Sequence, residues 1–318
     1  MVREKSSKYN KQRKSKIIMK KIKIGYFADG PWSHRAFNEL VADTSLEIKF
    51  IVPRTDTKDF TLKKLAKEHN INYLKDVKIN SEEFINIAKK YNCDLFISMS
   101  FNQIFKNKIL KIPKLKTINC HAGKLPFYRG RNILNWVLIN DEKEFGITIH
   151  YIDEGIDTGD IIIQEVFPIT DNDNYNSLLE VAYLGCSNLL YKAVKKIQQG
   201  GFKSISQSDI HPIGFYCGIR GPGDELINWN QNSRSIFNFV RALSYPGPVA
   251  RAFINEIEMK IHKVSILKDS IPYTNTIGQI VGKSERKIIV KTKDTVIEIT
   301  DYEYDGKLRI GQKFTYEK

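Results

Sequence analysis

The sequence is poor in the residues and runs that mark several common classes of protein. Its 318 residues include four cysteines, at positions 93, 120, 186 and 217, with no Cys-x-x-Cys pair and no His/Cys cluster. A disulfide scaffold and a zinc site are therefore not expected, no other metal is predicted, and a reducing compartment such as the cytoplasm fits. No apolar run approaches the ~20 residues that cross a bilayer. Lys20, Lys21 and Lys23 interrupt the N-terminal apolar stretch, so a signal peptide is not expected either.

Two glycine motifs that hold phosphates are also missing. No Gly-x-Gly-x-x-Gly follows the first predicted strand, and Gly-x-x-x-x-Gly-Lys-Ser/Thr occurs nowhere in the chain. Their absence argues against a dehydrogenase and a nucleotide hydrolase. The glycine-rich stretch at 218–223 has no strand before it and is interpreted as a flexible linker.

Positive charge is concentrated at one end of the chain. The formal net charge is +14, but residues 1–23 hold ten Lys or Arg against one Glu, which leaves about +5 for the remainder. Residues 1–18 are predicted to be a basic, solvated tail, with an RNA-contacting or membrane-surface arm as the alternative. Met19 as the true start is a further hypothesis. Because the charge outside the tail is modest for gripping a phosphate backbone, nucleic acid is not the expected partner.

From residue 21 the chain alternates between strand and helix patterns. Strands are predicted at 22–27, 46–52, 95–99 and 117–120, and helices at 33–42, 61–69 and 81–91, with Ser33 as a cap for the first helix. The alternation predicts an α/β fold with a Rossmann-like, mostly parallel sheet and helices on both faces. Because ligands of such sheets bind beyond the carboxyl ends of the strands, the third and fourth predicted strands should border one crevice.

The last third of the chain has a different pattern. A long helix at 175–198, a turn-rich connection at 203–224 and a helix at 233–243 precede short β-type runs at 251–254, 259–266, 276–281, 287–291 and 295–299. Short strands separated by turns predict a smaller, OB-like open β-barrel. We therefore expect three parts: the tail at 1–18, an N-terminal domain at 19–205, and a linker, helix and barrel domain at 206–318.

The stretch from 117 to 166 holds the chemically active groups. Strand alternation places Asn119 and His121 on one side of a strand and Cys120 on the other. A turn-rich loop, a helix at 132–139 and a hairpin of strands 146–152 and 161–167 follow, with an acidic turn at 153–160. A lone histidine at a strand end is commonly structural, and an acidic turn can be a simple hairpin connection. Calcium is excluded, because the sixth and twelfth positions from Asp153 are Thr158 and Gln164.

Taken together, these residues resemble the catalytic region of the folate-dependent formyltransferases. The matching positions are Asn119, His121, Leu125, Pro126, Arg129, Gly130, Asp153, Gly155 and Asp157 to Asp160. The segment from Asp224 to Trp229, the segment from Phe239 to Leu243 and the pair Pro246-Gly247 are similar to the start of that family's C-terminal open barrel. The resemblance covers about residues 21–315 and implies that the N-terminal domain is the catalytic domain of a formyltransferase.

The resemblance also implies roles for three side chains. Transfer of a formyl group to an amine needs a proton acceptor, a stabilised oxyanion and a proton for the departing nitrogen. His121 can carry the proton, and Asn119 can donate to the oxyanion. Asp157 can orient His121 or hold a water that relays protons. Asn119, His121 and Asp157 are therefore the predicted catalytic residues.

The formyl donor implied by the resemblance is N10-formyltetrahydrofolate. Its pterin is expected between the acidic turn and the segment that follows the strand at 95–99. Phe101, Ile104 and Leu125 are the expected apolar walls, and Asp153 and Asp157 the expected polar contacts.

The acceptor predicted from the sequence is the amine of a nucleotide-linked amino-dideoxysugar, dTDP-, GDP- or UDP-linked, of the kind used for lipopolysaccharide O-antigen synthesis. The chain lacks the basic, glycine-containing insertion that methionyl-tRNA formyltransferases carry after the second strand. Its expected acceptor contacts, which resemble those of sugar-nucleotide formyltransferases, are Tyr128, Arg129, Arg131, Asn132 and Trp136. Helix capping and surface solvation are the alternative roles of Arg131 and Asn132.

Several alternatives for the whole chain stay open. A methionyl-tRNA formyltransferase is the main one, followed by a formyltetrahydrofolate hydrolase and a non-catalytic folate-binding protein. A phosphoribosylglycinamide formyltransferase is disfavoured because that family lacks the C-terminal barrel. A homodimer through the barrel or the hairpin at 147–167 is a further possibility.

Overall fold

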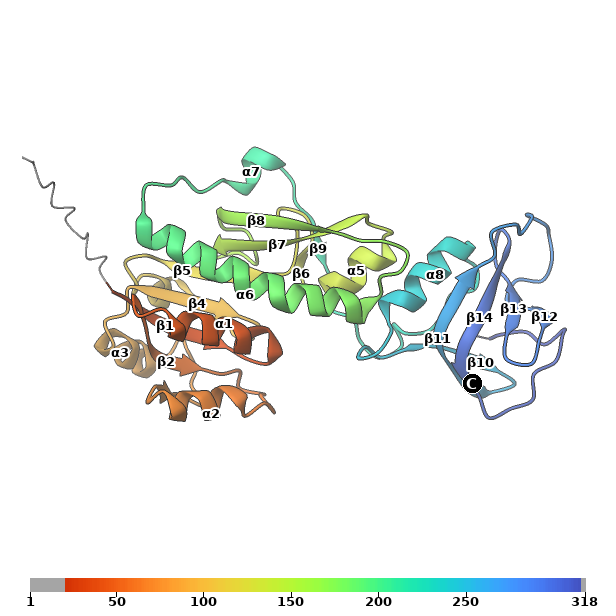
Figure 1. Cartoon of the computed structure of the whole chain (residues 1–318), viewed down its shortest axis with the longest axis horizontal. Coiled ribbons are helices and arrows are strands. Elements are labelled where there is room, and N and C mark those ends of the chain that lie inside the picture. The colour runs from red at the N-terminus through yellow and green to blue at the C-terminus, as the bar shows by residue number, and fades with distance from the viewer. Residues whose placement is uncertain (1–20, 316–318) are drawn as a thin grey trace, which may run out of the picture.

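The computed structural model describes residues 21–315, so the predicted tail at 1–18 lies outside the described residues (Figure 1). The strands of the larger sheet are β1 (Ile22–Ala28), β2 (Leu46–Val52), β3 (Asn72–Tyr73), β4 (Leu95–Met99), β5 (Thr117–His121), β7 (Glu144–Tyr151) and β8 (Ile161–Pro168). They lie in the order β3-β2-β1-β4-β5-β7-β8. The first five are parallel, and β7 and β8 are antiparallel to their neighbours. The predicted Rossmann-like, mostly parallel sheet is confirmed.

Helices cover both faces of this sheet. They are α1 (Pro31–Ala42), α2 (Thr61–Glu68), α3 (Glu82–Lys90), α4 (Asn107–Leu110), α5 (Ile133–Ile139) and α6 (Tyr175–Gln199). Alternate residues of the central strand β4 enter two separate cores: Ile97 packs with α1 and α6, whereas Phe96 packs with α3 and α4. A parallel sheet buried on both faces needs apolar residues at both registers of its strands, which explains the continuous apolar runs.

Two serines show how local sequence sets the helix starts. Ser81 caps α3 as its side chain accepts a hydrogen bond from the Phe84 N–H at 3.2 Å. The prediction that Ser33 caps the first helix is wrong. Helix α1 begins two residues earlier, because Pro31 has the fixed φ that suits the first turn of a helix. The Ser33 hydroxyl donates instead to the Gly30 carbonyl at 2.8 Å.

The second sheet is smaller and antiparallel. Its strands are β10 (Ala250–Ile254), β11 (Ile257–Ile266), β12 (Ile280–Lys283), β13 (Ile288–Lys291) and β14 (Val296–Glu303), in the order β10-β11-β14-β13-β12. Helix α8 (Ser233–Ala242) packs on it through Ile236 and Val240. Bridges from Phe253 to Thr315 and from Gln279 to Lys313 join the end of the chain to both edges of the sheet. One segment thus connects the two edges of the sheet, which agrees with the predicted open barrel.

The connection between the sheets packs on the first one. Helix α7 (Gln207–Ile210) and strand β9 (Tyr216–Cys217) lie in it, and β9 pairs in parallel with β6 (Arg129–Gly130). Further along, α8 contacts α5, where the buried Asn135 Nδ2 donates to the Ala242 carbonyl at 2.7 Å. The chain was predicted to divide between residues 205 and 206, and that division remains a proposal.

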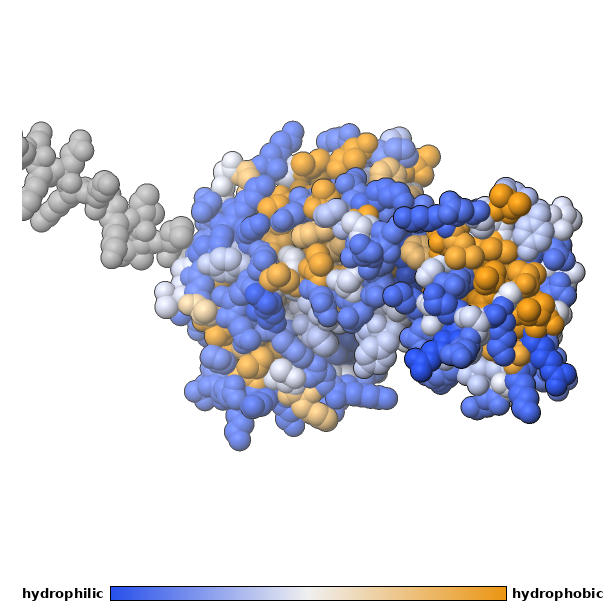
Figure 2. Space-filling model, turned by 45° about the vertical axis from the view of Figure 1, so that its right-hand side comes forward, coloured by the Kyte–Doolittle hydropathy of each residue, from blue (hydrophilic) through white to orange (hydrophobic). Residues whose placement is uncertain are grey.

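Hydrophobic residues are exposed over the part of the molecule that holds the second sheet, as Figure 2 shows. Large apolar side chains exposed in that part of the chain include Ile257, Ile271 and Ile310. The homodimer stays a prediction. Among residues 21–315, no helix combines the length and the apolar character that a membrane crossing requires.

Candidate active site

A cavity of about 950 Å³ opens beyond the carboxyl ends of β4 and β5. Its wall comprises the segment after β4, the start of α5, the acidic turn and the connection around β9. Six of its polar side chains come from the strands and the turn: Ser98, Asn119, His121, His150, Asp153 and Asp157. This is the edge at which ligands of parallel sheets bind, and it is the crevice that the sequence predicts.

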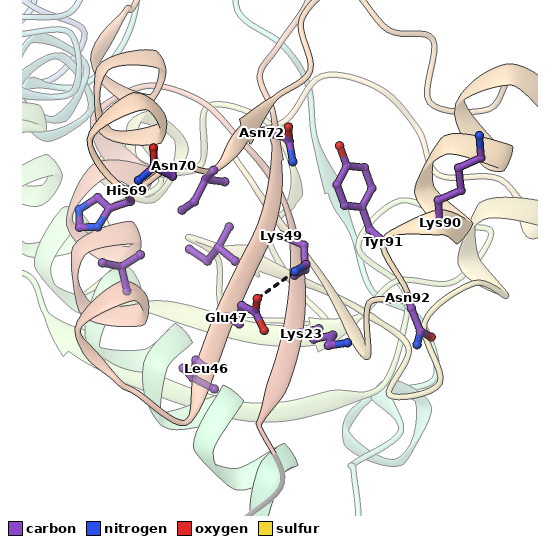
Figure 3. Close-up of a pocket in the computed structure, with 13 residues that line it drawn as sticks. Lys23, Leu46, Glu47, Lys49, His69, Asn70, Asn72, Lys90, Tyr91 and Asn92 are labelled. Atoms are coloured by element: carbon purple, nitrogen blue, oxygen red, sulfur yellow. Dashed lines mark hydrogen bonds and ion pairs between the residues drawn. The ribbon is translucent and has the colours of Figure 1, made fainter.

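A second cavity, of about 710 Å³, lies at the amino-terminal ends of β1, β2 and β3, at the end of the sheet opposite to the first cavity (Figure 3). Lys23, Lys49 and Tyr91 are among its lining residues, and the Lys49 ammonium pairs with Glu47 at 2.9 Å. None of the three predicted catalytic side chains lines it. The first cavity is therefore the candidate active site.

The three predicted catalytic side chains meet in the first cavity. Asn119 Nδ2 lies 3.4 Å from Asp157 Oδ1, and His121 Nδ1 lies 3.6 Å from Asp157 Oδ2. His121 Nε2 is 2.7 Å from the Tyr128 carbonyl, which can only accept, so Nε2 carries a hydrogen. In the neutral ring, Nδ1 then holds the free lone pair. Asp157 Oδ2 accepts a further hydrogen bond from the Gly130 N–H at 2.9 Å.

The electrostatics of this group favour a neutral base beside an ionised carboxylate. Burial lowers the pKa of His121, against the opposing charge of Asp157. Burial alone would raise the pKa of Asp157, but His121, His150 and the Gly130 N–H hold that pKa well below its ordinary value. The imidazole can therefore accept a proton near neutral pH, and the imidazolium that forms would face a carboxylate.

Gly123 makes room for the His121 ring. A Cβ at this position would lie 2.4 Å from His121 Nε2 and 2.5 Å from the Tyr128 carbonyl oxygen. The Gly123 carbonyl is fixed from the other side by the Thr148 hydroxyl, which donates to it at 2.7 Å. The loop after β5 therefore needs glycine here for the imidazole to reach its backbone partner.

His150 belongs to the same cluster, although it is not among the residues predicted from the sequence. It is buried on β7 directly opposite Asn119, and its Nδ1 donates to the Tyr151 carbonyl at 2.8 Å. Its Nε2 lies 3.3 Å from Asn119 Nδ2 and 3.4 Å from Asp157 Oδ1. The only sequence signal was its place in a predicted strand, because the pairing of that strand with β5 is a tertiary property. In the part of the chain described, no group of three or more His, Cys, Asp or Glu side chains is arranged to hold a metal.

The residues predicted to contact the folate divide into two groups. Phe101, Ile104 and Asp153 line the cavity with Asp157, whereas Leu125 does not. The Leu125 side chain is buried, and its carbonyl accepts from Gln164 Nε2 at 2.9 Å, so it supports the loop from behind. The cavity fits a folate: its volume is large enough for a drug-sized ligand, and its wall combines apolar side chains with the polar acidic turn.

The residues predicted to contact the acceptor also divide. Arg131 and Asn132 line the cavity, whereas Tyr128, Arg129 and Trp136 do not. The Tyr128 hydroxyl bonds to Glu142 at 2.6 Å, the Arg129 guanidinium bonds to Gln207, and Trp136 Nε1 donates to the Gly218 carbonyl at 2.9 Å. These three side chains hold neighbouring segments in place. Asn132 is the N-cap residue of α5, but its side chain makes no capping hydrogen bond and accepts instead from the Arg220 N–H at 3.0 Å.

The connection after β9 supplies wall residues that the sequence did not reveal. Tyr216, Cys217, Ile219 and Arg220 all line the cavity. The Arg220 guanidinium lies over the Trp136 ring at 5.2 Å, which attaches the glycine-rich stretch to α5. The prediction of a flexible linker is therefore wrong for this segment: nothing in its glycines signals a distant aromatic partner.

Comparison with known proteins places both parts of the chain. Residues 33–184 match the family described as formyl transferase, and residues 221–315 match the formyl transferase C-terminal domain. A methionyl-tRNA formyltransferase of Clostridioides difficile (strain 630) is 33% identical over 249 residues, which cover 78% of this chain and 79% of that protein.

Solved structures show the same fold. The sugar 3N-formyltransferase WlaRD, crystallised with dTDP and 5-N-formyl-THF, has a TM-score of 0.66 at 24% identity and covers 91% of this chain and 99% of its own. The N-formyltransferase from Helicobacter canadensis, in complex with folinic acid and dTDP-3-aminofucose, has a TM-score of 0.64 at 22% identity and covers 89% and 99%. The family matches in both parts, with a relative at 33% identity, show that this chain belongs to the folate-dependent formyltransferases and is a formyltransferase enzyme.

Proposed function

We propose that the enzyme moves a formyl group from N10-formyltetrahydrofolate to a primary amine, with Asn119, His121 and Asp157 as its catalytic residues. The observation that carries the proposal is the meeting of these three side chains in one cavity beyond β4 and β5. Phe101, Ile104 and Asp153 would border the folate.

The proposed step forms a bond between the amine nitrogen and the formyl carbon and then breaks the bond from that carbon to the folate nitrogen. His121 Nδ1 takes the proton of the attacking amine and passes it to the departing nitrogen. Asp157 stabilises the imidazolium that exists between these two proton transfers. The contacts of Asn119 Nδ2 to Asp157 and His150 are long, at 3.4 and 3.3 Å, so one N–H can turn to the oxyanion.

Methionyl-tRNA is the acceptor that the comparisons favour, which reverses the order predicted from the sequence. Proteins of that name from three organisms, Clostridioides difficile among them, match with 31–33% identity over 77–79% of this chain. The sugar N-formyltransferases, at 22–24% identity, support the fold alone.

A nucleotide-linked amino sugar is the second candidate acceptor, favoured by the short connection between β2 and α2. Arg54 in this connection lines the cavity, and both its bonds to Asp56 measure 2.8 Å. Asn102 Nδ2 also donates to Asp56 at 3.0 Å, which ties the connection to the segment after β4. The connection is thus folded against the cavity wall, where Arg131 would pair with a diphosphate.

An acceptor screen separates these candidates. The enzyme is incubated with N10-formyltetrahydrofolate and either charged initiator tRNA or a panel of dTDP-, GDP- and UDP-linked amino sugars, with His121→Asn as the inactive control. Formylmethionyl-tRNA supports the first candidate, and a sugar formamide supports the second. Formate released equally with and without any amine would contradict both and indicate a hydrolase.

A further inference from the structure

Gln207 is a buried amide that links the connection between the two sheets to the acidic turn. It opens α7 and is 3% exposed. Its Nε2 donates to the carbonyls of Asp157 and Gly159, both at 2.8 Å. Its Oε1 accepts from Arg129 Nε at 3.1 Å and Nη2 at 2.7 Å. Because carbonyls only accept and a guanidinium only donates, these partners fix the orientation of the amide.

The turn that Gln207 holds has a backbone that needs support. Asp157 has a φ of 54°, in the left-handed region that costs a non-glycine residue about 1 kcal/mol or more. At Gly159 a Cβ would lie 1.9 Å from the Tyr151 carbonyl oxygen, so the turn is pressed against the end of β7. Two hydrogen bonds from one amide to this turn restrict the direction in which the Asp157 side chain leaves the backbone.

Gln207 also fixes the segment on the other side of the carboxylate. Its partner Arg129 precedes Gly130, whose N–H donates to Asp157 Oδ2 at 2.9 Å. The backbone of Arg129 is itself held by the residue before β9, since its N–H donates to the Phe215 carbonyl at 3.1 Å. One side chain therefore sets the spacing between the Asp157 backbone and the N–H that binds its carboxylate.

We propose that Gln207 is a positioning residue for formyl transfer, which aims the Asp157 carboxylate at His121 through the backbone of the acidic turn. The inference rests on the proposed function, because it requires Asp157 and His121 to act together. The segment that connects the two sheets would then do more than join two domains. Its residue Gln207, which follows the predicted catalytic domain in sequence, would complete the active site.

The test compares Gln207→Ala with wild-type enzyme in the pH dependence of kcat and in the KM values of donor and acceptor. We expect kcat to fall about 10- to 100-fold, as displaced catalytic groups do, with both KM values within about threefold. The acid limb of the kcat profile should move to lower pH, because the Asp157 charge raises the pKa of His121 and a displaced carboxylate raises it less. Wild-type kcat with an unchanged acid limb, or a loss confined to KM, would overturn the proposal.

Gln207→Glu sharpens the test. Its carboxylate keeps an oxygen for Arg129 but has no N–H for the two carbonyls, and protonation restores one donor. Its activity relative to wild type should therefore rise as the pH falls. A fixed ratio across the pH range would contradict the positioning role.

Gln198→Ala is the matched control. Gln198 lies on α6 away from the cavity, where its Nε2 donates to the Ser45 carbonyl at 3.3 Å. Its loss should lower Tm and leave the pH profile unchanged.

NMR titration of the His121 ring, assigned with His121→Asn, reads the position of Asp157 without any acceptor. If wild-type enzyme transfers no formyl group but the His121 pKa is lower in Gln207→Ala, the proposed function fails and the positioning contact stands. If the wild-type enzyme is active but the His121 pKa is unchanged in Gln207→Ala, only the positioning role is overturned.

Discussion

Each of the two sheets buries an ionisable side chain, and the two side chains differ in how fully their hydrogen-bonding groups are paired. Lys291 of the second sheet is 1% exposed, and its ammonium donates to the carbonyls of Thr292 at 2.8 Å and of Asp294 and Thr295, both at 3.1 Å. His121 of the first sheet is 7% exposed and lines the cavity, and its Nδ1 lies 3.6 Å from Asp157 Oδ2. Burial lowers the pKa of both groups.

The two side chains differ in whether any hydrogen-bond donor or acceptor is left without a partner. The three donors of Lys291 are matched by three carbonyls, so its charge stabilises a turn. His121 lines the cavity and keeps a lone pair on Nδ1, which suits it to the proposed role of base. Variants at each site can break or sharpen this contrast.

The largest expected effect comes from His121→Asn. The amide can keep a bond to the Tyr128 carbonyl but cannot carry the proton, so kcat should fall by about 10²- to 10⁴-fold. Folate binding, measured by fluorescence titration, should stay within about twofold of wild type. Retention of a substantial rate would show that another group carries the proton.

Asn119→Ala should follow, with a loss of about 10²- to 10³-fold in kcat from the missing oxyanion donor. Single-turnover formyl transfer measures the chemical step directly. An effect confined to KM would instead assign Asn119 to substrate binding.

Gly123→Ala should cost about 10- to 100-fold in kcat. The added methyl occupies the space of the His121 ring and displaces it from the Tyr128 carbonyl. Gly221→Ala is the control, since a Cβ at Gly221 meets no atom within 4 Å. Equal activity of the two variants would contradict the steric argument.

Lys291→Met tests the buried ionisable side chain of the second sheet. It leaves three carbonyls without their donor and should lower the free energy of unfolding by about 2–3 kcal/mol, measured by urea denaturation. Formyl transfer by the folded variant should remain at the wild-type rate, because Lys291 lines no part of the candidate site. A large loss of kcat in folded protein would break the contrast.

The smallest effect is the pH dependence of the wild-type enzyme. A base acts in its neutral form, and burial lowers the pKa of His121 from its ordinary value of 6.5. Activity should therefore hold as the pH falls to about 6.5 and decline only below it. Initial rates at saturating substrates across pH 5–8 check this, and a midpoint above 7 would contradict a desolvated His121.

The sequence by itself determined the longer helices and strands and their order. Short apolar runs located β2 and β4 with their bounds, and the strand register placed Asn119 and His121 on one side. These features depend on neighbours within a few residues, which a linear pattern contains. The resemblance then connected those residues with Asp157.

Only the tertiary structure decided what completes the cavity. His150 lies 31 residues from Asn119, and Gln207 lies 50 residues from Asp157 in the chain. Neither Leu125 nor Trp136 lines the cavity, although both belong to matching segments. Which distant polar groups meet depends on how the connection packs back on the first sheet, and an isolated glutamine or glycine in a sequence carries no information about its partner.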